Sequence, residues 1–257
     1  MTRIAQITDP HLGHHAEYRL AGVPTLASFD AVLQSALTHD PDLLLVTGDI
    51  AAEPTVEAYE LFFGLIEKTG LPMVWLPGNH DDVAVAERAE KATRYKKIHD
   101  VGNWRLVLLD SVIPGSPNGA LGDAERQRFD TLMAENTQEH LLVCVHHHPI
   151  GIGSAWLDQQ RLEDAEPFLS QVRQMPLVRG VVWGHVHQAF ETVESDVLYA
   201  CTPSTCIQFL PNSETFALDA VAPGFRIFDL DANGRITTQV HRVDDAYVEP
   251  DLESTGY

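Results

Sequence analysis

The feature that most constrains the fold is an alternation of short apolar runs with helical patterns over the first 190 residues. Continuous apolar runs such as Leu43–Thr47 and Leu141–Val145 are typical of strands that are buried on both faces. Strands that alternate with helices favour an α/β fold with a largely parallel core. The predicted strands are 4–8, 43–47, 73–76, 106–109, 141–145 and 178–183, and the predicted helices are about 25–39, 55–68, 82–91, 123–135 and 162–175.

The pattern changes after residue 190, where short strand-like runs follow one another without a helix of useful length. Asn233-Gly234 predicts a hairpin turn between the last two of these runs. Because no Gly-, Ser- or Pro-rich linker separates this part from the rest, we expect one domain over residues 1–257 with a second, more antiparallel sheet. The runs are 197–201, 206–210, 215–218, 224–230 and 235–243.

Polar residues follow five of the predicted strands, at the point where each strand ends. The carboxyl ends of strands in open α/β sheets form the crevice in which ligands bind, so these residues should converge in space. In chain order they are Asp9 and His11; Asp49; Asn79, His80 and Asp81; His146; and His185 and His187.

Each of these motifs also has an ordinary structural explanation. Asp49 could be a solvated loop carboxylate, and Asn79 could simply tolerate left-handed backbone after a glycine. The run His146–His148 could be one core histidine with two exposed neighbours, and His185 with His187 a buried polar pair. These explanations fail together, because five strand ends would each have to acquire such residues by chance while the strands stay apolar.

The chemistry of these side chains predicts a metal site. Carboxylate, imidazole and amide donors suit Mn²⁺, Fe or Zn²⁺, and the 13 histidines of the chain are clustered. Seven donors are too many for one tetrahedral ion but suit two ions that share a carboxylate. Glycines precede three of the motifs, and we expect Gly48, Gly78 and Gly184 to let the backbone approach the metals closely.

Charge and composition exclude other classes of function. Lys and Arg number 17 against 37 Asp and Glu, and a net charge of −20 opposes binding to nucleic acid. No apolar run approaches the roughly 20 residues of a membrane helix. Three cysteines and the absence of a recognisable signal sequence lead us to expect a cytoplasmic protein without disulfides or membrane contacts. We expect the protein to be a monomer or a homodimer.

The motifs, in this order, resemble the calcineurin-like metallophosphoesterases. Within that family the chain is most similar to the bacterial class III 3′,5′-cyclic AMP phosphodiesterases, and the resemblance covers nearly the whole chain. Outside the metal motifs it is carried by the segments 75–81, 146–149, 154–158, 202–209 and 240–257.

The resemblance implies a four-layer α/β sandwich of two mixed sheets flanked by helices. It also implies two divalent ions, Fe or Mn with Zn as the alternative. One ion would be held by Asp9, His11 and His187, the other by Asn79, His146 and His185, with Asp49 bridging them. His147 is the alternative to His146 because the histidine run offers more than one register.

The activity that the resemblance implies is hydrolysis of 3′,5′-cyclic AMP to 5′-AMP by a hydroxide that bridges the two ions. His80 would serve the leaving oxygen as hydrogen-bond donor or general acid, and Asn79, His80 and His187 would contact the substrate. Asp81 would orient His80 or cap the following helix. Thr205, Cys206 and Gln208 would line the nucleobase side, although Cys206 could equally be a small core residue. The alternatives are a broader hydrolase of glycerophosphodiesters and a non-catalytic scaffold of the same fold.

Overall fold

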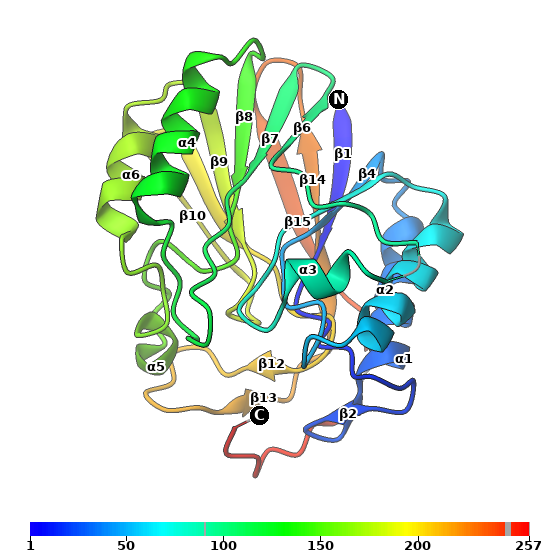
Figure 1. Cartoon of the computed structure of the whole chain (residues 1–257). Coiled ribbons are helices and arrows are strands. Elements are labelled where there is room, and N and C mark those ends of the chain that lie inside the picture. The colour runs from blue at the N-terminus through cyan, green and yellow to red at the C-terminus, as the bar shows by residue number, and fades with distance from the viewer. Residues whose placement is uncertain (90, 245–247, 257) are drawn as a thin grey trace.

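Two β-sheets lie face to face in the computed structural model, which describes residues 1–89, 91–244 and 248–256. Helices cover the outer face of each sheet, so that the layers run helix, sheet, sheet, helix (Figure 1). Both sheets contain parallel and antiparallel pairs. This is the four-layer sandwich of two mixed sheets that the resemblance implies.

The first sheet has three parallel strands at one side and two antiparallel strands at the other. β1, β4 and β5 run parallel, β14 pairs antiparallel with β1, and β15 pairs antiparallel with β14. The order across the sheet is β15 (Ile236–Arg242), β14 (Gly224–Leu230), β1 (Thr2–Ile7), β4 (Leu43–Val46) and β5 (Met73–Trp75).

The second sheet has a parallel centre with an antiparallel strand at each edge. β11, β9, β8 and β7 run parallel, while β10 and β6 pair antiparallel with their neighbours. The order is β10 (Phe190–Glu194), β11 (Val197–Cys201), β9 (Val178–Trp183), β8 (His140–Cys144), β7 (Trp104–Leu108) and β6 (Ile98–Val101).

The remaining elements are six helices and two short hairpins within the described residues. The helices are α1 (Thr25–Leu37), α2 (Val56–Thr69), α3 (Val83–Ala86), α4 (Gly122–Ala134), α5 (Ala155–Asp158) and α6 (Ala165–Arg173). The hairpins are β2 (Arg19–Leu20) with β3 (Val23–Pro24), and β12 (Gln208–Phe209) with β13 (Leu218–Asp219).

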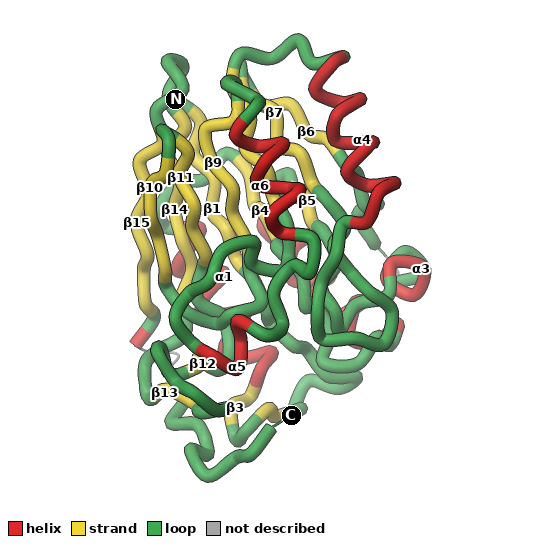
Figure 2. The backbone as a smooth tube through the Cα atoms, turned by 90° about the vertical axis from the view of Figure 1, so that its left-hand side faces the viewer, coloured by secondary structure: helices red, strands yellow, loops and turns green. Residues whose placement is uncertain are grey.

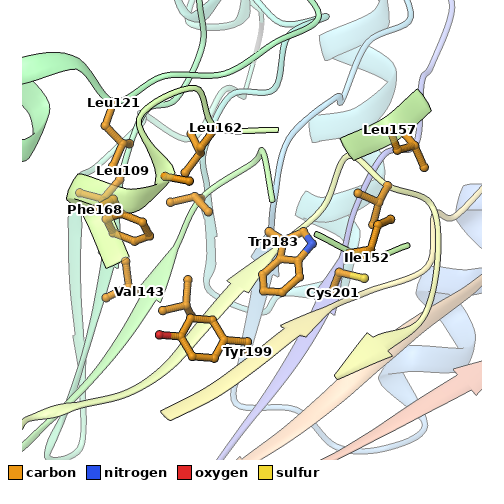
Figure 3. Packing of buried hydrophobic residues seen from close by; sticks show 14 of the residues in the cluster. Leu109, Leu121, Val143, Ile152, Leu157, Leu162, Phe168, Trp183, Tyr199 and Cys201 are labelled. Carbon is orange, nitrogen blue, oxygen red and sulfur yellow. The ribbon is translucent and has the colours of Figure 1, made fainter. Parts of the chain in front are cut away.

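The continuous apolar runs are explained by burial on both faces of each sheet. Successive side chains of a strand point to opposite faces. In β4, Leu43 and Leu45 therefore pack between the two sheets, whereas Leu44 and Val46 pack under α1 and α2. The cluster on the outer face of the second sheet includes Phe168 of α6, which lies beside strand residues such as Val143 (Figure 3).

The loops that follow the parallel strands gather at one end of the sandwich. Figure 2 shows these loops at the end where β12, β13 and α5 also lie. Because β1, β4 and β5 of one sheet and β8 and β9 of the other end there, residues far apart in the sequence meet at this end.

Most of the predicted elements are confirmed with boundaries shifted by one to three residues. Thr55 caps α2 by accepting a hydrogen bond from the Ala58 amide, Gly70 ends that helix in a left-handed conformation, and Gly234 makes the turn between β14 and β15. The helix predicted over 82–91 is wrong beyond Ala86. The Glu87 amide still bonds to the fourth residue back, but the Arg88 and Ala89 amides bond to the third, as in tight turns, and residue 90 lies outside the described residues.

The prediction of a separate antiparallel sheet after residue 190 is also wrong. β14 and β15 extend the first sheet, and β10 and β11 extend the second. The late strands pair with the exposed backbone edges of β1 and β9, which would otherwise lack hydrogen-bond partners on that side. The change in the sequence pattern therefore marks strands that join the two existing sheets without helices between them, and not a separate sheet.

Candidate metal centre

The residues predicted at five strand ends meet across the seam between the two sheets. Asp9, Asp49 and Asn79 follow strands of the first sheet, whereas His146 and His185 follow strands of the second. Hydrogen bonds join the strand ends directly. The Asp9 amide, for example, donates to the Gly48 carbonyl at 3.0 Å. The His185 amide in turn donates to both carboxylate oxygens of Asp9, at 3.1 and 3.0 Å.

Asp49 lies at the centre of this arrangement. Its Oδ2 is 3.3 Å from His146 Nε2 and 3.7 Å from His11 Nε2, and its Oδ1 accepts a hydrogen bond from the His80 amide at 2.9 Å. Burial alone would raise the pKa of Asp49, but the facing His146 and His80 hold it well below its usual value. An ionised carboxylate that faces histidines on two sides has the geometry to be shared between two cations.

One group of donors consists of Asp9, His11 and His187, whose ligand atoms lie within 4.8 Å of one another. The Nε2 atoms of His11 and His187 are 3.2 Å apart, and His187 Nε2 is 3.6 Å from Asp9 Oδ1. The Nδ1 of His187 lies 2.9 Å from the Ile207 carbonyl, which fixes the proton there and turns the Nε2 lone pair toward the group. Burial lowers the pKa of His11 well below its usual value, and the neutral ring is the form that binds metals.

The second group forms around His146. Its Nδ1 donates to the Thr47 carbonyl at 2.7 Å, which leaves Nε2 facing Asp49 and, at 3.2 Å, the Oδ1 of Asn79. Although burial opposes protonation, the Asp49 carboxylate raises the pKa of His146 to about 9. An imidazole nitrogen between two oxygen acceptors calls for a positive charge, whether a proton or a metal ion.

His185 completes this second group. Its Nε2 is buried without a hydrogen-bond partner among the described residues, and burial lowers its pKa well below the usual value. Its ring lies 5.1 Å from that of His146, between centroids. A buried, neutral imidazole with an unsatisfied nitrogen fits a metal ligand, since such atoms are costly unless something binds them.

All three residues of the histidine run are fully buried, which rules out the alternative of two exposed neighbours. His147 also lies within 4.8 Å of the donors of His146 and His185, and its Nδ1 is 2.8 Å from Ser111 Oγ. His148 instead faces Asp158, with 3.4 Å between its Nε2 and Oδ1. The contacts with Asp49 and Asn79 favour His146 over His147 as the ligand.

Backbone strain is concentrated at this site. Five of the seven proposed ligands have positive φ angles of 45–66°, which non-glycine residues seldom adopt. Such conformations persist where the surrounding structure requires them, and they cluster at functional sites. These residues are Asp9, His11, Asp49, His185 and His187.

The three glycines before the motifs act differently from the prediction. An added Cβ would lie 2.5 Å from His146 Nδ1 at Gly48, 2.2 Å from Asp49 Oδ1 at Gly78, and 2.1 Å from Thr8 Oγ1 at Gly184. Side chains at these positions would therefore collide with His146, Asp49 and Thr8. The glycines let the strand ends approach one another, and this close approach is what assembles the donors.

The prediction that Asp81 caps the following helix is wrong. Its carboxylate accepts hydrogen bonds from the Ile50, Ala51 and Gly78 amides and from the Tyr59 hydroxyl, whereas Asp82 caps α3. Burial and the nearby Asp49 raise the pKa of Asp81 to about 6. Asp81 thus ties the loop that carries Asp49 to the loop that carries Asn79.

His80 stands between two hollows at the edge of the donor cluster. Its Nδ1 lies 2.9 Å from the Ala52 carbonyl. On one side is a hollow of about 280 Å³ that is also lined by Asp49, Asn79 and His185. On the other side is a hollow of about 540 Å³ that Asn79 and His80 line as well. A substrate that reaches the donors can therefore extend to either side of His80.

The residues expected on the nucleobase side do not line either hollow. Thr205, Cys206 and Gln208 are buried, and the Gln208 amide donates to the Ser204 carbonyl at 2.8 Å. Cys206 packs with its Sγ 3.3 Å from the Asp9 carbonyl oxygen, so the alternative of a small core residue holds. These residues instead pack against the loops that carry the donor side chains, such as the loop of Asp9, and so support the site.

Sequence reasoning missed two sets of residues. The first set is Trp156, Phe209 and Phe216, which line the smaller hollow. The only signal in the sequence for this role was that the three residues are aromatic. Gln6, buried in β1, donates to Thr47 and accepts from Thr202, which follows β11 of the other sheet. A single polar residue within the apolar run 4–7 was the available signal for a polar contact between the sheets.

No helix in the described parts of the chain is long and apolar enough to cross a membrane.

Comparison with known proteins identifies similar sequences over nearly the whole chain. The sequence model for calcineurin-like phosphoesterases matches residues 2–189. The 3′,5′-cyclic adenosine monophosphate phosphodiesterase CpdA of Vibrio vulnificus is 40% identical, over 99% of this chain and 95% of that protein. The protein of the same name from Pseudomonas aeruginosa is 37% identical, over 99% of this chain and 94% of that protein.

Solved structures show the same fold at low sequence identity. A dimetal phosphatase from Danio rerio has a TM-score of 0.64 at 14% identity, over 95% of this chain and 99% of that one. The purple acid phosphatase PPD1 from yellow lupin also has a TM-score of 0.64 at 14% identity, over 97% of this chain and 52% of that one. The sandwich of two sheets is thus shared with these proteins.

Proposed function

The chain belongs to the calcineurin-like phosphoesterase family, and we propose that it hydrolyses 3′,5′-cyclic AMP to 5′-AMP. The observation that carries this proposal is the similarity to cyclic AMP phosphodiesterases over 99% of this chain and 94–95% of theirs. In this proposal residues 1–257 act as one domain. The donor cluster at the seam of the sheets is its active site.

We propose that two divalent ions, Fe or Mn with Zn as the alternative, bind at the two donor groups. Asp9, His11 and His187 would hold one ion, and Asn79, His146 and His185 the other, with Asp49 shared. The buried neutral imidazoles and the central carboxylate fit this role. When bound, such a pair would activate a water molecule as the nucleophile and would neutralise charge on the phosphate.

His80 would handle the proton of the leaving group. Its Nδ1 proton is held by the Ala52 carbonyl, so Nε2 can donate to an oxygen only when the ring is protonated. The 3′-oxygen of cyclic AMP leaves as a poorly stabilised alkoxide and therefore needs that proton. We assign His80 to this step, and Asn79, His80 and His187 to contacts with the phosphate.

The ions would also reconcile the substrate with the charge of the protein. A chain of net charge −20 repels anions at long range. Bound divalent ions are the largest local charges in such a site and attract a phosphodiester once it is near.

A second candidate is favoured by the larger hollow beside His80. Four acidic residues line it, namely Glu53, Asp81, Asp82 and Asp110. Such a surface suits the ammonium group of a glycerophosphodiester such as glycerophosphoethanolamine. Hydrolysis of glycerophosphodiesters is therefore the alternative function.

The two candidates are separated by kcat/KM for cyclic AMP and for glycerophosphoethanolamine, measured with Mn²⁺, Fe²⁺ and Zn²⁺ in turn. We expect cyclic AMP to be the better substrate by at least tenfold with the best metal. A preference for glycerophosphoethanolamine with every metal would overturn the proposal. Full metal loading without turnover of any phosphodiester would favour a non-catalytic scaffold.

A further inference from the structure

We propose that the smaller hollow beside His80 binds the adenine base, stacked against Trp156 and Phe216. The inference rests on the proposed function and assigns a subsite to the base of its substrate. The hollow has a volume of about 280 Å³ and is lined at one end by Asp49, Asn79, His80 and His185. Its other end is formed by aromatic and uncharged residues.

The aromatic wall is a packed cluster of three rings. The centroid of Trp156 lies 5.0 Å from that of Phe209 and 5.3 Å from that of Phe216, and the two phenylalanines are 5.6 Å apart. All three pairs have the edge-to-face geometry that aromatic rings prefer. Because each ring is held by the other two, the wall is preorganised and a base that stacks on it has little to reorder.

The wall is joined directly to the metal centre. Phe209 stacks on His187, with 4.3 Å between the ring centroids and 14° between the planes. His187 belongs to one donor group, while Asn79 and His185 at the mouth of the hollow belong to the other. A cyclic nucleotide with its phosphate at the donors therefore has its base next to the aromatic rings.

The two hollows beside His80 differ in a way that decides between them. The larger one presents Glu53, Asp82 and Asp110, and no Phe, Tyr or Trp lies among the described residues that line it. A nucleobase is flat, uncharged and offers a π-face, and stacking on aromatic side chains is its usual mode of recognition in proteins. The base therefore belongs in the aromatic hollow and not in the acidic one.

Gln160 supplies a polar group at the same hollow. A glutamine amide can donate to N7 and accept from the amino group of adenine at once. Guanine presents two acceptors, N7 and O6, at the same edge, so the amide oxygen would have no donor to pair with. We infer that Gln160 favours adenine over guanine.

The test compares cyclic AMP with a substrate that lacks only the base, the 3′,5′-cyclic phosphate of 1-O-methylribofuranose. Both share the ring phosphate and the leaving oxygen, so the ratio of their kcat/KM values isolates the base. Trp156→Leu and Phe216→Leu keep apolar volume but remove the π-face, and Phe190→Ala removes a partly buried ring that packs on Trp183 of the second sheet.

We expect the wild-type ratio to exceed ten, and to fall about tenfold in Trp156→Leu and Phe216→Leu but less than twofold in Phe190→Ala. Gln160→Leu should lower the preference for cyclic AMP over cyclic GMP about tenfold. A wild-type ratio near one, or ratios unchanged in both leucine variants, would overturn the subsite while leaving cyclic phosphodiester hydrolysis intact. Failure of the wild type on both cyclic substrates would instead overturn the proposed function, and the subsite with it.

Discussion

Replacing Gly184 by alanine tests whether close approach of the strand ends assembles the proposed metal site. Gly184 lies between β9 and His185, and its backbone is not in the left-handed region, so alanine is compatible with its conformation. The difficulty is space alone. The new Cβ would lie 2.1 Å from Thr8 Oγ1 and 2.8 Å from Asp9 Oδ2.

The structure sets the size of the expected effect. Thr8 Oγ1 would have to retreat by about 1.3 Å to reach an ordinary contact distance from the Cβ. That movement breaks its 2.7 Å hydrogen bond to Asp9, whose carboxylate also accepts from the His185 amide. Overpacking costs about 1–3 kcal/mol and a lost hydrogen bond about 1 kcal/mol, so the free energy of unfolding should fall by about 2–4 kcal/mol.

The assay combines urea unfolding of the metal-free protein with elemental analysis after metal reconstitution. We expect Gly184→Ala to be less stable and to retain fewer than two ions, because the Asp9 carboxylate is displaced. Gly64→Ala is the matched control, since nothing lies within 4 Å of its Cβ in α2 and alanine there should add about 0.5–1 kcal/mol. Two ions bound by Gly184→Ala, with a stability loss under about 0.5 kcal/mol, would refute the close packing described here.

Three further predictions test the assignment of individual residues. Asp49→Asn should leave fewer than two ions per chain by elemental analysis, since a neutral amide bridges cations poorly, and a single ion in fully active protein would contradict the shared carboxylate. His146→Ala should reduce metal content and activity far more than His148→Ala, whose ring faces Asp158; a mild effect for His146→Ala and a large one for His147→Ala would move the ligand by one residue. His80→Ala should slow cyclic AMP hydrolysis about 10²–10⁴-fold with metal content unchanged, while largely sparing a p-nitrophenyl phosphodiester with its stabilised leaving group. An equal loss on both substrates would place His80 in phosphate binding instead.

The strands and the donor types could be predicted because their signals are local. Leu43–Val46 reads as a strand buried on both faces, and its residues do alternate between the inner and outer cores. Polar residues directly after such runs lie at the carboxyl ends of parallel strands whatever the details of packing. The cytoplasmic location and the oligomeric state stay predictions.

The detailed roles could not be predicted because they depend on long-range contacts. Asp81 and Asp82 are identical neighbours, yet one binds amides of the loop after β4 and the other caps α3. Which aspartate binds the amides and which caps the helix depends on where the chain turns relative to β4, which lies about 30 residues earlier in the sequence. Likewise, Phe209 and Phe216 form one wall with Trp156 only because the β12–β13 hairpin folds against α5.

The sequence by itself therefore determined the α/β class, the set of donor side chains and their place at the strand ends, since apolar periodicity and residue chemistry are local properties. The tertiary structure alone decided that the late strands extend both existing sheets, that glycines serve the packing of strand ends, and that Asp49 faces His11 and His146 at once. The physical reason is that backbone pairing and steric contact join segments that are distant in the chain. The sequence around one residue does not specify which atoms of a distant segment will lie about 3 Å from it.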